Sequence, residues 1–184
     1  MRRMNVLSVA AVVLFAVSVT AQTRPDFSGR WTSEPEPASG VGQAGAAPGG
    51  GGRASSGNMG SGWGPNLTVT QDANRLTVEY AFFARGDMQP PLRFVYALDG
   101  SETKNSVMMG RGIQVQTSKT AWDGDKLVIA TVHSFTHPET NEPMKIEVKQ
   151  TLSLGSPTSM TVETTRRGVL GGPPSVTKTV YKKS

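Results

Sequence analysis

Apolar and polar residues alternate along much of this chain, and three stretches do so on both sides of a short polar turn. These stretches are residues 67–80, 113–132 and 146–164, with turns at Asp72-Ala73-Asn74, Asp123-Gly124-Asp125 and Gly155-Ser156-Pro157. Period-two alternation puts apolar side chains on one face of a strand, and these turn residues favour tight reversals of the chain. The pattern therefore predicts three β-hairpins in succession.

The alternation extends to nine strands, and the segment between Asp99 and Gly112 has room for a further short one. The predicted strands are Phe27–Ser33, Leu67–Gln71, Arg75–Phe83, Leu92–Leu98, Ile113–Ala121, Lys126–Phe135, Met144–Leu154, Ser159–Thr165 and Ser175–Tyr181. No segment has sustained helical periodicity, so there is no crossover helix to link parallel strands. We expect an all-β, antiparallel up-and-down meander of about 8–9 strands closed as a barrel, with a β-sandwich as the alternative.

The same alternation predicts which side chains face the interior. The expected inward set is Leu67, Val69, Leu76, Val78, Tyr80, Phe82, Leu92, Phe94, Tyr96, Leu98, Ile113, Val115, Leu127, Ile129, Ile146, Val148, Gln150, Leu152 and Leu154. Burying an unpaired polar group costs about 1–3 kcal/mol. Tyr80, Tyr96 and Gln150 are therefore candidates to orient a ligand in an apolar cavity. The alternative is that Gln150 bonds a tyrosine or a water in a filled core.

The N-terminus has the features of a cleaved export signal. Arg2 and Arg3 precede an apolar run, residues 6–19, and Val19-Thr20-Ala21 offers the small residues that a signal peptidase reads. The apolar run is shorter than the roughly 20 residues of a spanning helix. We expect residues 1–21 to be a signal peptide removed after Ala21, and residues 22–184 to form a single exported domain, periplasmic or secreted, with no membrane span.

Residues 35–65 differ in composition from the rest of the chain. Eleven of the 21 glycines lie between Gly40 and Gly64. Such a stretch does not bury enough apolar surface to offset its ordering entropy, so we expect a disordered Gly/Pro-rich insertion after the first strand. Trp63, near its end, is expected either to dock on the barrel or to be exposed.

The charge of the mature chain is small and spread out. Without residues 1–21, 17 basic residues face 14 acidic ones, which gives a net charge of +3. A nucleic-acid-binding protein typically has a basic stripe interleaved with aromatic residues, and this sequence has none. We therefore expect no nucleic-acid partner, and an anionic envelope surface or an envelope protein remains a candidate partner.

The first predicted strand opens with the segment Pro25-Asp26-Phe27-Ser28-Gly29-Arg30-Trp31. Its Gly29-x-Trp31 resembles the G-x-W opening of lipocalin-like (calycin) barrels. The whole segment is similar to the P-D-F-S-G-x-W opening of small, uncharacterised secreted bacterial proteins thought to share such a barrel. The resemblance implies a lipocalin-like barrel in which Gly29 and Trp31 form a structural plug at the closed end. It also implies a basic residue from a late strand over Trp31, for which Arg166, Arg167 and Lys178 are the candidates.

The sequence contains no recognisable catalytic or metal-binding constellation. His133 and His137 are the only two histidines, and in an extended strand they would lie about 13 Å apart, too far to share a metal. There is no cysteine and no serine in a nucleophile elbow. We therefore expect no enzyme, no metal and no cofactor. The first hypothesis is an exported, non-catalytic barrel that binds a small apolar or amphipathic ligand. The alternative is an envelope structural or protein-interaction domain with a filled core and no ligand.

Overall fold

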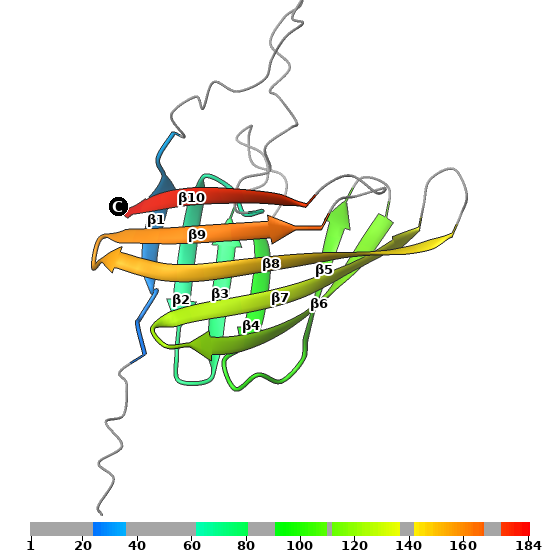
Figure 1. The fold of residues 1–184 in the computed structure, drawn as a ribbon, viewed down its shortest axis with the longest axis horizontal. Helices are drawn as coiled ribbons and strands as arrows, with labels where there is room; N and C mark the ends of the chain where they lie inside the picture. Colours follow the sequence, from blue (N-terminus) through cyan, green and yellow to red (C-terminus); the bar gives the residue numbers. More distant parts are fainter. Residues whose placement is uncertain (1–23, 36–61, 81–90, 110–111, 137–141, 168–173) are drawn as a thin grey trace, which may run out of the picture.

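The computed structural model describes residues 24–35, 62–80, 91–109, 112–136, 142–167 and 174–184. All regular structure in these ranges is strand, as Figure 1 shows. The strands are β1 (Gly29–Ser33), β2 (Asn66–Gln71), β3 (Arg75–Tyr80), β4 (Leu92–Ala97), β5 (Thr103–Met109), β6 (Gly112–Asp123), β7 (Lys126–Thr136), β8 (Pro143–Ser156), β9 (Ser159–Arg166) and β10 (Ser175–Lys183). The predicted all-β class is confirmed, and β5 is the further strand for which the sequence left room.

The ten strands form one antiparallel sheet in the order β4-β3-β2-β1-β10-β9-β8-β7-β6-β5. Strands that follow one another in the sequence are neighbours except for β4 and β5, and β1 pairs with β10 to join the two halves (Figure 1). The sheet curls until its edge strands β4 and β5 face each other. The result is a nearly closed up-and-down barrel, which is compatible with a lipocalin-like fold.

Residues 1–21, predicted to be a signal peptide, residues 36–61 of the predicted insertion, Phe82 and His137 all lie outside the described residues. Within the described ranges, no helix is long and apolar enough to cross a membrane.

The three predicted hairpins are confirmed as the β2–β3, β6–β7 and β8–β9 pairs. In the first turn the Asp72 carboxylate accepts the backbone N–H groups of Asn74 and Arg75, at 2.7 and 2.8 Å. The third turn was predicted two residues too early. A β-bulge between Leu154 and Ser156 absorbs one residue, so the strand continues and Ser156 still pairs with Ser159.

Most of the predicted inward faces are buried, but β6 presents the opposite face from the one expected. Ile113 and Val115 are 69% and 40% exposed, whereas the polar residues between and after them point inward. Two of the inward polar groups have side-chain hydrogen bonds: Ser118 Oγ lies 2.9 Å from Thr131 Oγ1, and the Thr120 hydroxyl donates to the Ala97 carbonyl. Because pairing removes most of the cost of burial, polarity alone was a poor guide to the face of β6.

Side chains close the seam between β4 and β5. The Asn105 side-chain carbonyl accepts the Val95 backbone N–H at 2.8 Å, and its amide donates to the Val95 carbonyl at 3.1 Å. One side-chain amide thus takes the place of a peptide group in the missing ladder. Both backbone groups of Val95 would otherwise need a partner near the buried wall of the barrel.

Replacing Asn105 with leucine is expected to destabilise the fold by about 1–3 kcal/mol, because two hydrogen bonds are lost and both Val95 groups are left unpaired. Urea unfolding measures this change. Ser106→Ala, at the adjacent exposed position on the same strand, is the matched control and should change stability by less than about 0.5 kcal/mol. Equal stability of both variants would show that the seam does not depend on this amide.

Candidate functional site

The barrel has two ends that differ in structure. The turns after β2, β4, β6 and β8 lie at one end, here called the turn end, and β1, β3, β5, β7 and β9 finish at the other, the loop end (Figure 1). Aromatic side chains fill the turn end. Phe27 and Trp122 stack with ring centroids 6.3 Å apart, and the Phe27 N–H donates to Gln71 Oε1 at 3.0 Å.

Trp31 has 1% of its surface exposed, and this burial is what the predicted structural plug requires. Its indole N–H donates to the Phe27 carbonyl at 2.9 Å, so the buried polar atom is satisfied. Gly29 lies two residues earlier with φ +146°, and a Cβ there would overlap Cε of Lys183. Glycine at this position therefore leaves the space through which the lysine side chain passes.

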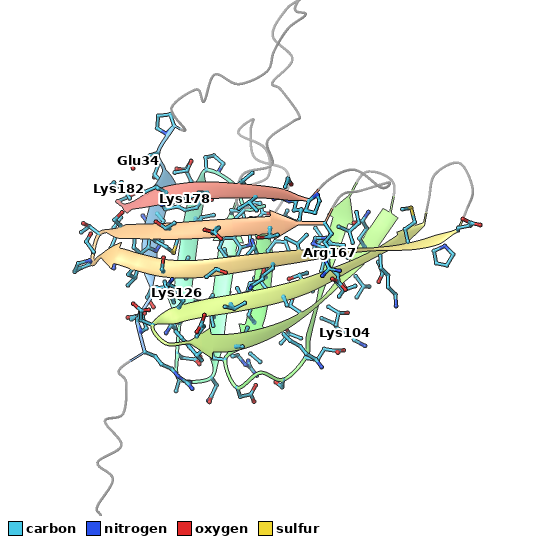
Figure 2. All side chains as sticks on the ribbon, viewed as in Figure 1. Glu34, Lys104, Lys126, Arg167, Lys178 and Lys182 are labelled. Carbon is cyan, nitrogen blue, oxygen red and sulfur yellow. The ribbon has the colours of Figure 1, made fainter. Side chains whose placement is uncertain are left out.

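The basic residue over Trp31 is Lys183, and none of Arg166, Arg167 or Lys178. Lys183 Nζ lies 5.4 Å from the centre of the Trp31 ring. The two residues are directly opposite in the β1–β10 register, so their side chains leave the sheet on the same face. Arg167 and Lys178 lie on the outer surface (Figure 2).

Buried polar residues interrupt the apolar inward faces of β7, β8 and β9. On β7, β8 and β9 the buried apolar residues nearest the turn end are Leu127, Ile129, Leu152, Met160 and Val162. The next inward positions toward the loop end are Thr131, Gln150 and Thr164, each no more than 5% exposed. Gln150 pairs in register with both Ile129 and Thr164. All the buried polar residues of the described chain lie on β5–β9, so this wall alone carries a polar band.

Tyr80, Tyr96 and Gln150 all face the interior, with exposed fractions of 7%, 2% and 5%. The structure brings them together around the backbone of residues 62–64. The Tyr80 hydroxyl donates to the Gly62 carbonyl at 3.2 Å, and Tyr96 accepts a hydrogen bond from the side chain of Trp63. A Cβ at Gly62 would lie 3.7 Å from Nε2 of Gln150. The three predicted residues therefore surround part of the protein's own chain.

Two further residues contribute to this site: Trp63, for which docking was one of the two expectations, and Tyr181, which sequence reasoning missed. Trp63 docks on the barrel, with only 8% of its surface exposed and its ring 6.3 Å from that of Tyr96. The Tyr181 hydroxyl donates to the Gly64 carbonyl at 3.1 Å. The isolated tryptophan in a glycine-rich stretch was the available signal for Trp63. Tyr181 stands near the end of an ordinary alternating strand, so nothing local pointed to its contact.

Two basic groups lie near the same segment. Arg166 Nη2 would be 3.4 Å from a Cβ at Gly62, and burial lowers the pKa of this half-buried guanidinium. Burial also lowers the pKa of His133, and the nearby charge of Arg166 lowers it further. No carboxylate of the described residues is buried. The loop end of the interior therefore favours neutral or anionic groups over cations.

The tyrosines predict a loss of stability at alkaline pH. Burial raises the pKa of Tyr80 to about 12, and burial also raises the pKa of Tyr96. The folded state therefore holds these protons where the unfolded chain releases them, so stability is complete below about pH 10 and declines as the pH rises toward about 12. Unfolding by urea between these pH values measures the decline. Tyr80→Phe and Tyr96→Phe should each flatten it, and an unchanged slope would contradict the assignment.

A separate depression of about 280 Å³ lies over β1, β2 and β3. Its lining includes the outward-facing residues Arg30, Thr32, Asn66, Thr68 and Glu79. Tyr80 also lines this depression and is the residue that it shares with the site around residues 62–64, whereas Tyr96 and Gln150 do not line it.

In the ranges that the structure covers, no three His, Cys, Asp or Glu side chains are grouped so as to hold a metal ion.

The comparisons with known proteins add no relative: no protein family and no curated protein matches this chain.

Proposed function

We propose that the protein is an exported, non-catalytic, lipocalin-like barrel that binds a small apolar or amphipathic ligand in its interior, among Tyr80, Tyr96 and Gln150. The observation that carries the proposal is the set of buried polar residues on β5–β9, among them Thr131, Gln150 and Thr164, in an interior that is otherwise apolar or aromatic. A few polar groups in an apolar interior match a ligand with an apolar body and a polar head. The body would pack on apolar side chains such as Leu152, and the head would form hydrogen bonds with Gln150 and Thr164.

The cost of burying polar groups supports this reading. A core with only a structural role gains most from apolar side chains, because a buried polar group contributes little even when it is paired and costs about 1–3 kcal/mol when it is not. The polar band on β5–β9 faces a wall on β2–β4 whose buried residues are all apolar or aromatic. One polar wall opposite one apolar wall is the arrangement by which binding pockets fix the orientation of a ligand.

The charges near the site narrow the ligand class. The half-buried Arg166 lies near Gly62, since its Nη2 would be 3.4 Å from a Cβ at that position. A ligand whose head is a carboxylate or another hydrogen-bond acceptor would meet donors from Arg166, Gln150 and the tyrosine hydroxyls. A cationic head would meet like charge.

Native mass spectrometry of residues 22–184, purified gently from a bacterial periplasm, tests the proposal. We expect a stoichiometric adduct that leaves on denaturation. Gln150→Leu should weaken the affinity for the ligand by about threefold to tenfold, the effect of one lost hydrogen bond, and should thereby lower the fraction of protein that carries the adduct. Thr151→Val, at the next position on the same strand and on its other face, is the control and should keep the adduct. An adduct indifferent to Gln150 would place the ligand elsewhere.

The alternative function, an envelope structural or protein-interaction domain, is favoured by a different observation. Trp63 occupies interior volume that a ligand would otherwise fill, and the outer surface exposes Ile113, Val115 and Val176. A filled barrel would act through that outer surface. Two results together would favour this function over ligand binding. The protein would have the mass of the chain without an adduct, and it would bind a protein partner through a contact that Ile113→Ser abolishes.

A further inference from the structure

The barrel holds residues 62–64 through side chains in the way that proteins hold a ligand. This segment precedes β2 and takes no part in the strand ladders. Its carbonyls accept hydrogen bonds from two tyrosine hydroxyls of the barrel wall, Tyr80 to Gly62 at 3.2 Å and Tyr181 to Gly64 at 3.1 Å. The nearest backbone bond, from Ser33 N–H to the Pro65 carbonyl at 2.7 Å, lies just beyond the segment.

The Trp63 side chain fills the space between these two anchors. It is 8% exposed, belongs to the hydrophobic core and lies against Tyr96, which accepts its hydrogen bond. Gly62 has φ +84°, and a Cβ there would lie 3.4 Å from Nη2 of Arg166 and 3.7 Å from Nε2 of Gln150. The positive φ favours glycine there and turns the chain so that the tryptophan enters the barrel.

We infer that the site is built for an aromatic ring flanked by carbonyl oxygens, and that Gly62-Trp63-Gly64 is a tethered occupant which an external ligand of this chemistry displaces. The inference rests on the proposed function and gives it a ligand class and a form of regulation. The site recognises its ligand through three groups. The Tyr80 and Tyr181 hydroxyls are the two donors, and the Tyr96 hydroxyl is an acceptor in the aromatic space between them.

The contacts that hold the segment are ones that an external ligand can replace. Each is a side-chain contact, so releasing residues 62–64 breaks no ladder and leaves β1 and β2 paired through Trp31 and Leu67. A ligand with matching groups restores the same hydrogen bonds and the same buried area. The apparent affinity for the ligand is then the intrinsic affinity multiplied by the fraction of molecules in which Trp63 has left the site.

The geometry specifies a probe, the peptide N-acetyl-Trp-Gly-amide. Its acetyl carbonyl corresponds to that of Gly62, its indole to Trp63, and its glycine carbonyl to that of Gly64. N-acetyl-Ala-Gly-amide is the matched control, because it keeps both carbonyls and lacks the ring. Two kinds of ligand have this chemistry: a free aromatic compound with carbonyl groups, and an aromatic residue within a peptide. The dipeptide probe represents the second kind, and indole-3-acetamide represents the first.

Displacement is measured on the wild-type chain, residues 22–184, labelled with 5-fluorotryptophan. The chain has three tryptophans, and Trp63→Phe assigns the resonance of Trp63. We expect the unlabelled probe to move that resonance to the position of a solvent-exposed tryptophan, with Trp31 and Trp122 unchanged. A probe that binds while the Trp63 resonance stays in place overturns the inference.

Calorimetry on Trp63→Ala gives the second, independent measurement. Removing the occupant is expected to raise the affinity for the probe at least tenfold over wild type. Tyr80→Phe and Tyr181→Phe in that background should each weaken binding by about threefold to tenfold, the effect of one hydrogen bond. Equal affinity in wild type and Trp63→Ala overturns the inference.

The results also separate this inference from the proposed function. If wild type yields the mass adduct but neither wild type nor Trp63→Ala binds the probe or indole-3-acetamide, the proposed function stands and the inference is overturned. If there is no adduct and no binding of either compound, both are overturned.

Discussion

Replacing Trp31 with alanine is expected to lower the free energy of unfolding by about 3–5 kcal/mol. The side chain is 1% exposed, and its loss leaves a cavity at the turn end next to Phe27 and Trp122. The variant also loses the hydrogen bond to the Phe27 carbonyl and the contact with Lys183. Urea unfolding followed by circular dichroism measures the change, because this signal does not depend on the tryptophan that is removed.

Two further variants separate the contributions of Trp31. Trp31→Phe keeps an aromatic ring and loses the indole N–H, so it should cost clearly less than alanine. Val176→Ala removes methyl groups from a side chain that is 63% exposed, and should change stability by less than about 0.5 kcal/mol. A cost below about 1 kcal/mol for Trp31→Ala would contradict its role as a plug, because such a value is typical of a side chain that is only partly buried.

Gly29→Ala is expected to destabilise the protein by about 2–4 kcal/mol, combining backbone strain with overlap of side-chain atoms. The backbone at Gly29 has φ +146°, a region that residues with a Cβ rarely adopt. The added methyl group would also overlap the Lys183 side chain where it crosses toward Trp31. Either effect alone would be tolerable, but here both fall on one residue.

A double-mutant cycle tells the two effects apart. Lys183→Ala removes the overlapping atoms, so Gly29→Ala should cost about 1–3 kcal/mol in that background, the part due to backbone strain. Thermal unfolding of the four proteins measures the coupling. If the cost of Gly29→Ala does not depend on Lys183, the lysine does not occupy the space above this glycine.

The local pattern of the sequence predicted the strands and hairpins well, because the wall of a barrel imposes period-two burial on each strand. Leu76, Val78 and Tyr80 are all buried as expected, and Gln150 faces inward between Val148 and Leu152. The pattern failed on β6, where the inward residues are polar and the outward ones include Ile113 and Val115. Hydrogen bonds made to neighbouring strands decided that face, and these are not visible in the strand itself.

The candidate site was only partly predictable for a related reason. Tyr80, Tyr96 and Gln150 follow from alternation, whereas the groups that complete the site come from distant parts of the chain. Tyr181 reaches a carbonyl 117 positions away, and Lys183 reaches Trp31 through the pairing of β1 with β10. Local periodicity specifies the face of a residue, but its partner across the barrel depends on register and closure.

The pairing of β1 with β10 has a consequence for how the barrel is assembled. Every other pair of neighbours in the sheet is consecutive in the sequence, whereas the hydroxyls of Thr32 and Ser184, 3.1 Å apart, are separated by 152 positions. Loop-closure entropy makes such a contact the slowest to form, so two local meanders, β1–β4 and β5–β10, come first and this ladder joins them last. While it is open, each meander presents a free strand edge to other molecules. Two chains that met at this stage would exchange their meanders across the β1–β10 ladder, and a domain-swapped dimer would be the characteristic misassembled form.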